Sequence, residues 1–87
     1  MIKILYRKNS EHERIVELFV DQLDKNYAVK AELVDSDTKD GIALAGLYDI
    51  MQFPAVLATR EDGQLIQAWV GELPLASEVS YFEHQSV

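Results

Sequence analysis

The order in which strand-like and helix-like patterns follow one another limits the fold of this chain more than any other property of its sequence. The short apolar runs typical of strands are Ile2–Tyr6, residues 29–33, Ala55–Thr59 and residues 64–70. The stretches typical of helices are residues 10–24, 42–51 and 74–82. The resulting order βαβαββα predicts an α/β fold with a four-stranded mixed sheet flanked by three helices, in a single domain of residues 1–87.

The first helix is expected to begin with a capping box. Ser10 and Glu13 have the spacing at which each side chain accepts a hydrogen bond from the other residue's backbone amide. The apolar stripe expected after this cap consists of Ile15, Leu18, Phe19, Gln22 and Leu23, widened by Val16 and Val20. We therefore predict that Ser10 is the N-cap of a helix that buries this stripe.

A polar segment, residues 35–41, precedes the second helix and superficially resembles a calcium loop. An EF-hand requires an oxygen ligand at its fifth position and glycine at its sixth, where this segment has a lysine and an aspartate. We predict instead a turn in which Asp37, Thr38 or Asp40 caps the next helix. The apolar composition of residues 42–51 predicts that this helix is well buried.

The dipeptide Asp62-Gly63 between the last two strand runs predicts a β-hairpin. Strict alternation in the second strand of this hairpin would place Leu65, Gln67 and Trp69 on one face. Trp69 belongs either to the core beneath the last helix, which we favour, or to an exposed patch. The last helix is expected to begin at Pro74 and to bury Leu75, Val79 and Phe82.

The chain contains no cysteine, which excludes disulfides, thiolate catalysis and cysteine-ligated metals. His12 and His84 stand alone without metal-ligand spacing, so we expect no metal and no other cofactor. Ser10 and His12 could be imagined as nucleophile and base. Residues two apart on a helix do not face each other, however, and no orienting acid stands at motif spacing. We therefore expect no enzymatic activity.

The formal net charge of −7 bears on the choice of partners. The lysines and arginines are scattered, whereas nucleic-acid binding requires a basic stripe. No apolar run approaches the length of about 18 residues that a membrane-spanning helix needs. We expect neither a nucleic acid nor a membrane as partner, and the cytoplasm as the default location.

Residues 47–57, LYDIMQFPAVL, carry a resemblance to a known superfamily. They are similar to the "Y-x-V-x-x-x-P-T-hydrophobic" segment of thioredoxin-like and glutaredoxin-like proteins. The hairpin at Glu61-Asp62-Gly63 and the strand end at Val70-Gly71 follow as they do in that superfamily. The resemblance covers nearly the whole chain in element order, and residues 48–71 carry most of it in identity.

The resemblance implies a cis peptide bond before Pro54 and, beside it, a backbone that pairs with an extended peptide or with glutathione. The superfamily's C-x-x-C or C-x-x-S motif falls here on residues 10–13, with Ser10 and Glu13 at the cysteine positions. The chain is therefore identified as a redox-inactive member, because a serine oxygen is far less reactive than a thiolate toward a disulfide.

The resulting hypothesis is a protein- or peptide-binding module that is a monomer or a weak homodimer. The binding residues expected are Asn9, Ser10, Glu11, His12, Phe53 and Pro54. Glu11 and Glu13 oppose an anion there, which favours a neutral or basic extended peptide. One alternative is a structural or regulatory protein that forms homo- or hetero-oligomers through another surface, such as the hairpin edge. A second alternative is a glutathione-binding protein.

Overall fold

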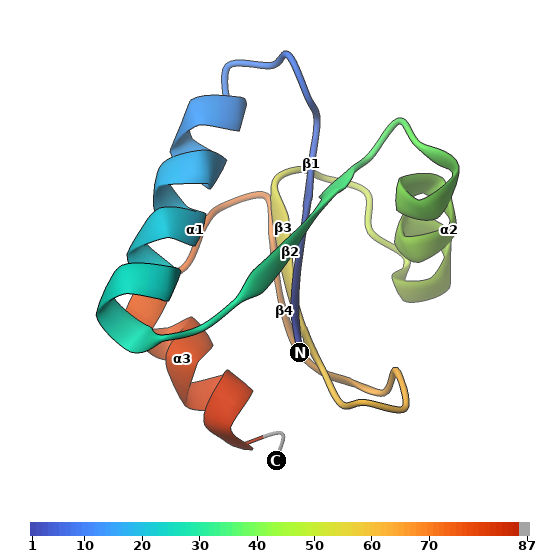
Figure 1. The fold of residues 1–87 in the computed structure, drawn as a ribbon. Helices are drawn as coiled ribbons and strands as arrows, with labels where there is room; N and C mark the ends of the chain where they lie inside the picture. The colour runs from blue at the N-terminus through green and yellow to red at the C-terminus, as the bar shows by residue number, and fades with distance from the viewer. Residues whose placement is uncertain (86–87) are drawn as a thin grey trace.

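A computed structural model describes residues 1–85 of the chain. The elements are β1 (Ile2–Tyr6), α1 (Glu13–Tyr27), β2 (Ala31–Asp35), α2 (Lys39–Tyr48), β3 (Ala55–Thr59), β4 (Leu65–Val70) and α3 (Ala76–Gln85). The strands form one sheet in the order β2-β1-β3-β4, in which β1 runs parallel to β2 and antiparallel to β3 (Figure 1). The predicted order and mixed sheet are confirmed. Within residues 1–85, no helix combines the length and apolar character needed to cross a membrane.

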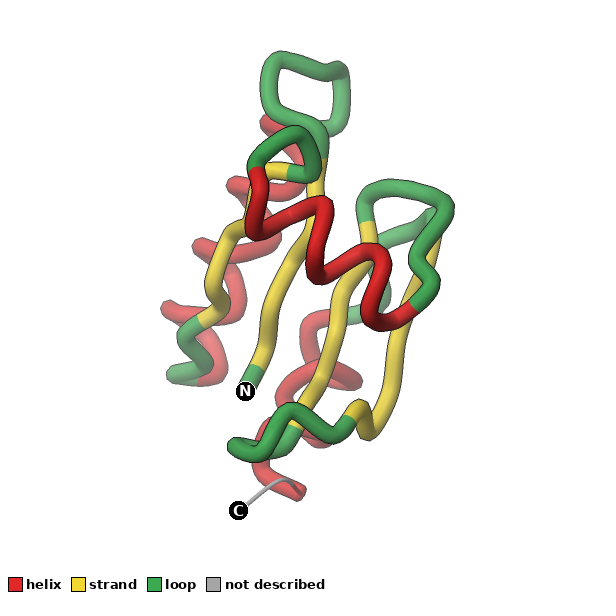
Figure 2. The backbone as a smooth tube through the Cα atoms, turned by 90° about the vertical axis from the view of Figure 1, so that its right-hand side faces the viewer, coloured by secondary structure: helices red, strands yellow, loops and turns green. Residues whose placement is uncertain are grey.

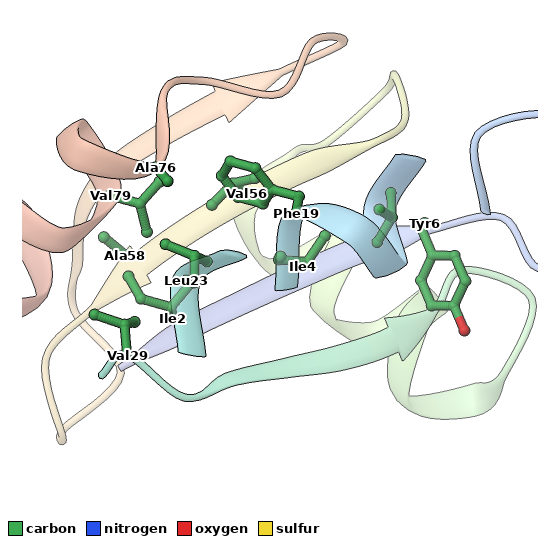
Figure 3. Packing of buried hydrophobic residues seen from close by; sticks show 11 residues of the cluster. Ile2, Ile4, Tyr6, Phe19, Leu23, Val29, Val56, Ala58, Ala76 and Val79 are labelled. Atoms are coloured by element: carbon green, nitrogen blue, oxygen red, sulfur yellow. The ribbon is translucent and has the colours of Figure 1, made fainter. Parts of the chain in front are cut away.

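The helices cover the two faces of the sheet unequally. Helices α1 and α3 lie on one face and α2 lies on the other, where it crosses in front of the strands in Figure 2. The side chains of β1 alternate between these faces: Ile2 and Ile4 point toward α1 and α3, and Leu5 points toward α2. In Figure 3, Ile2 and Ile4 pack against Phe19 and Leu23 of α1. The larger core therefore lies on the α1 and α3 side.

Helix α1 buries a narrower stripe than its sequence predicts. Val16, Phe19 and Leu23 are buried, whereas Ile15 and Leu18 are more than half exposed. The apolar arc of this helix is wider than the strip that contacts the sheet, so its outer members face solvent. The prediction that Ile15 and Leu18 are core residues was wrong.

Helix α2 begins three residues earlier than predicted and is much less buried. The Thr38 hydroxyl accepts a hydrogen bond from the Gly41 amide at 3.1 Å, which makes Thr38 the N-cap among the three candidates. Gly41 is the one buried residue of the helix. Ile42 and Leu47 are 63% and 71% exposed, which corrects the expectation of a well-buried helix. Only one side of α2 contacts the sheet, and nothing in residues 1–85 covers its other apolar residues.

Strand β4 contains an irregularity that sequence alternation did not reveal. The pairing with β3 shifts between Ala58 and Thr59, so that Ala58 faces Gln67 and Thr59 faces Leu65. Leu65 consequently packs in the cluster on the α2 side, away from the face of Trp69. The expectation that Leu65, Gln67 and Trp69 share one face was wrong for Leu65.

Trp69 lies partly buried against the core beneath α3, as favoured from the sequence. Its Nε1 donates to Glu78 Oε2 at 3.1 Å, and its ring meets the Phe82 ring edge-on with centroids 5.5 Å apart. Leu75, expected in the buried stripe, is 70% exposed because it precedes the helix, which begins at Ala76 and not at Pro74. The Leu75 carbonyl instead accepts hydrogen bonds from the Glu78 and Val79 amides.

Candidate functional site

The loop between β1 and α1 folds back on itself before the helix begins. Asn9 has a left-handed backbone with φ 63°. The Ser10 hydroxyl donates to the Arg7 carbonyl at 2.5 Å and accepts from the His12 amide at 3.3 Å. Glu13 Oε2 accepts from the Asn9 amide at 3.1 Å. These bonds hold residues 7–13 in a turn, in which Glu11 and His12 are exposed.

This loop corrects the predicted capping box. Helix α1 begins at Glu13, its N-cap position is His12, and no side chain bonds the helix start as a cap. Ser10 lies in the preceding turn because its hydroxyl bonds the Arg7 carbonyl. The Glu13 carboxylate reaches Asn9, one residue before the predicted partner. The two side chains thus accept hydrogen bonds as in a capping box, but each from an amide one residue nearer the N-terminus: Ser10 from His12, and Glu13 from Asn9.

The second half of the site is the segment that enters β3. The Phe53–Pro54 peptide bond is cis. The Pro54 carbonyl accepts from the Gly71 amide at 2.9 Å, which ties this segment to the end of β4. Gly71 has φ +90°, and a Cβ there would lie 2.6 Å from Gln52 Oε1, so glycine suits this close approach. Within residues 1–85, Phe53 makes no backbone hydrogen bond.

The two halves meet in a shallow depression of about 360 Å³. Its lining residues are Arg7, Ser10, Glu11, His12, Met51, Gln52 and Phe53. Four of the six predicted site residues thus come together, Ser10, Glu11, His12 and Phe53. The other two stand apart from the lining: Asn9 is exposed on the loop, and Pro54 is buried beneath the segment.

Three lining residues, Arg7, Met51 and Gln52, were missed from the sequence. Met51 and Gln52 directly precede Phe53, so a wider window around the proline would have included them. Met51 is 83% exposed and presents a flexible apolar side chain beside the depression. Arg7 lies far from Phe53 along the chain, and no signal in the sequence linked it to the proline segment.

Within residues 1–85, the depression shows no arrangement that activates a nucleophile or holds a metal ion. Glu11 Oε1 lies 3.8 Å from His12 Nε2, and these side chains are 88% and 47% exposed, so this pair is weak. The Ser10 hydroxyl donates to a backbone carbonyl, so His12 does not activate it as a nucleophile. Residues 1–85 hold no cluster of three or more histidine, aspartate or glutamate side chains that suits a metal ion.

No protein-family model and no curated protein matches this sequence. Among solved structures, thioredoxin 1 from Thermosipho africanus TCF52B is 13% identical with a TM-score of 0.67, over 97% of this chain and 90% of that one. Thioredoxin O2 from Arabidopsis thaliana, in the oxidized state, is 15% identical with a TM-score of 0.69, over 97% and 71%. A structure described as a malarial protein is 12% identical with a TM-score of 0.67, over 99% and 94%.

Proposed function

We propose that this chain, which has the thioredoxin fold but no cysteine, is a redox-inactive module that binds an extended protein or peptide segment. The binding surface is the depression between the β1–α1 loop and Phe53. The observation that carries this proposal is the free backbone of Phe53, two residues before the buried strand β3. Without a thiol, the surface retains recognition and loses dithiol exchange.

The sheet register explains why the Phe53 backbone is open. Strands β1 and β3 pair from Ile2 opposite Ala58 to Leu5 opposite Ala55. Continued in register, the pairing would set Arg7 opposite Phe53, but the Arg7 carbonyl instead accepts from Ser10. The Phe53 amide and carbonyl are therefore available to a ligand strand, which binds by main-chain hydrogen bonds.

Side chains around Phe53 define the class of ligand. Met51 and Phe53 offer apolar contact, while Glu11 and the net charge of −7 disfavour an anion. Arg7 is the one permanently cationic side chain of the lining. A neutral or basic extended peptide therefore fits this surface better than glutathione, which carries a net negative charge.

Amide chemical-shift mapping tests the proposal with three probes: a neutral extended peptide, a basic one, and glutathione. The expected result is joint perturbation of residues 9–12 and 52–55, with the peptides binding more tightly than glutathione. Perturbations confined to β4 would contradict the proposed site. Tighter binding of glutathione than of either peptide would identify glutathione, and not a peptide, as the ligand of this site.

A matched pair of exposed apolar residues sharpens this test. Met51→Ser removes an apolar contact at the depression and should weaken peptide binding about fivefold, equivalent to about 1 kcal/mol. Leu75→Ser makes a comparable change at a residue that is 70% exposed and does not line the depression, and should leave peptide affinity unchanged. Equal effects of the two variants would contradict the assigned surface.

A further inference from the structure

The two edges of the sheet differ in how they are protected. Strand β4 is irregular where it pairs with β3, and such a bulge hinders pairing with another strand. Strand β2 pairs with β1 along all five of its residues. In Figure 1, β2 lies in front of the other strands, with α1 and α2 to its sides and no element over it. The β2 edge is therefore open to another strand.

The backbone groups that β2 presents outward follow from one hydrogen bond. The Ser36 amide donates to the Tyr6 carbonyl at 2.8 Å, in register with the parallel β1–β2 pair. Since alternate residues of a strand bond to the same neighbour, Glu32 and Val34 bond to β1. Ala31, Leu33 and Asp35 consequently direct their amides and carbonyls away from the sheet. Of these, only the Asp35 carbonyl is used, by the Thr38 amide and hydroxyl.

We propose that β2 pairs antiparallel with β2 of a second copy of this chain, about a two-fold axis at Leu33. In this register Leu33 faces Leu33 of the second copy, and Ala31 faces Asp35 of the second copy. The outward backbone groups of the two copies then face each other, and all of them except the Asp35 carbonyl, which Thr38 uses, are available to form hydrogen bonds. The side chain of Leu33, which is 37% exposed, gains an apolar partner.

Charge selects this register over its neighbour. Moving the axis to Glu32 would also align outward backbone groups, but it would set Glu32 directly opposite its own copy. With the axis at Leu33, Glu32 faces Val34 of the second copy instead. Antiparallel pairing also brings Lys30, whose Nζ bonds Asp24 Oδ1 of its own copy at 2.6 Å, toward Asp35 and Asp37 at the end of the other strand. The axis at Leu33 thus avoids a direct Glu32–Glu32 pair and places one cation of each copy near the acidic strand end of the other.

Helix α2 enlarges the contact beyond the strand. A stable dimer buries about 800 Å² per copy, about a seventh of the 5583 Å² surface of this chain. Five residues of edge strand do not provide this area alone. A depression of about 270 Å³ beside β2 is lined by Glu32, Val34, Leu44 and Leu47, among others. Because the axis is perpendicular to the sheet, both α2 helices lie on the same face, and each exposed Leu47 turns toward the other copy.

Sedimentation equilibrium of the full chain tests the proposal. The apparent mass of the wild type should rise with protein concentration from 9.9 kDa to twice that value. Leu33→Lys should weaken association at least about tenfold, since an edge lysine opposes strand pairing. Gln67→Lys places the same charge on the other edge and should associate as the wild type does.

Several outcomes would overturn the proposal. One is a wild-type mass that stays at 9.9 kDa up to about 1 mM protein. Another is equal weakening by Leu33→Lys and Gln67→Lys, with circular dichroism showing that both variants are folded. Nuclear Overhauser contacts between Leu33 of differently labelled copies should identify the register, and contacts centred on Glu32 would refute it. Peptide affinity at Phe53 should be unchanged in Leu33→Lys, so the two proposals succeed or fail separately.

Discussion

The two faces of the sheet are held by different means. On the α1 and α3 side, Val16 and Leu23 of α1 and Val79 of α3 are fully buried against the sheet. On the other side, α2 contributes no fully buried side chain, and Leu44 and Ala45 contact the sheet only partly. Helix α2 is instead held at its start, by the Thr38 cap and the close approach of Gly41. Apolar content alone therefore does not predict which side of a helix is buried.

The largest expected effect is in the α1 core. Leu23→Ala removes a side chain with no exposed surface and should lower the free energy of unfolding by about 3 kcal/mol. Leu44→Ala, the same change on the partly buried face of α2, should cost about 1 kcal/mol. Urea denaturation of both variants measures these free energies of unfolding. Equal losses would show that the two faces of the sheet contribute equally to stability.

The second prediction concerns the contact that fixes α2. A Cβ at Gly41 would lie 2.0 Å from the Asp35 carbonyl oxygen, so Gly41→Ala must displace the helix start and should cost about 2 kcal/mol. Gly46→Ala is the matched control, because no atom lies within 4 Å of a Cβ there. It should stabilise the protein by about 0.5 kcal/mol through helix propensity. Thermal unfolding measures the stability of both variants. An unchanged stability of Gly41→Ala would show that the close approach of Gly41 to Asp35 does not fix the start of α2.

The smallest losses of stability are expected from variants at the starts of α2 and α1. Thr38→Ala removes a side-chain cap and should cost about 1 kcal/mol. Ser10→Ala removes exposed turn bonds that precede α1 and should cost about 0.5 kcal/mol or less. Chemical denaturation measures both. A loss at Ser10 as large as that at Thr38 would mean that the turn before α1 stabilises the helix as a cap does.

The fold was predictable because the sequence patterns of most elements agree with their packing. The strand runs matched β1 and β3 in full, and the order of elements was read correctly. The burial of α2 was not predictable, because its apolar residues surround the helix and Ile42 is indistinguishable in the sequence from a core residue. The face of Leu65 depended on a bulge, which leaves no mark in the alternation of residues.

The candidate site was predicted only in part, because the resemblance placed some of its residues and local sequence patterns did not reveal the others. Ser10, Glu11, His12 and Phe53 were placed together by the resemblance, and the structure brings them to one depression. The role predicted for Ser10 was wrong, because a serine three residues before a glutamate can form the hydrogen bonds of a turn as readily as those of a helix N-cap. Arg7 joins the depression through tertiary proximity to Phe53, which no local pattern encodes.

The central place of β1 in the sheet has a consequence for synthesis. As the chain leaves the ribosome, β1 can pair with β2 once α1 has formed, because these three elements are consecutive. Its other neighbour, β3, emerges only after α2, and the hydrogen bond from the Thr59 amide to the Met1 carbonyl closes that side last. Until then, the backbone of β1 that faces β3 is unpaired, and Ile2 and Ile4 lack their contacts with Val56 and Ala58. The nascent chain is therefore most exposed to misassembly between the appearance of β2 and that of β3.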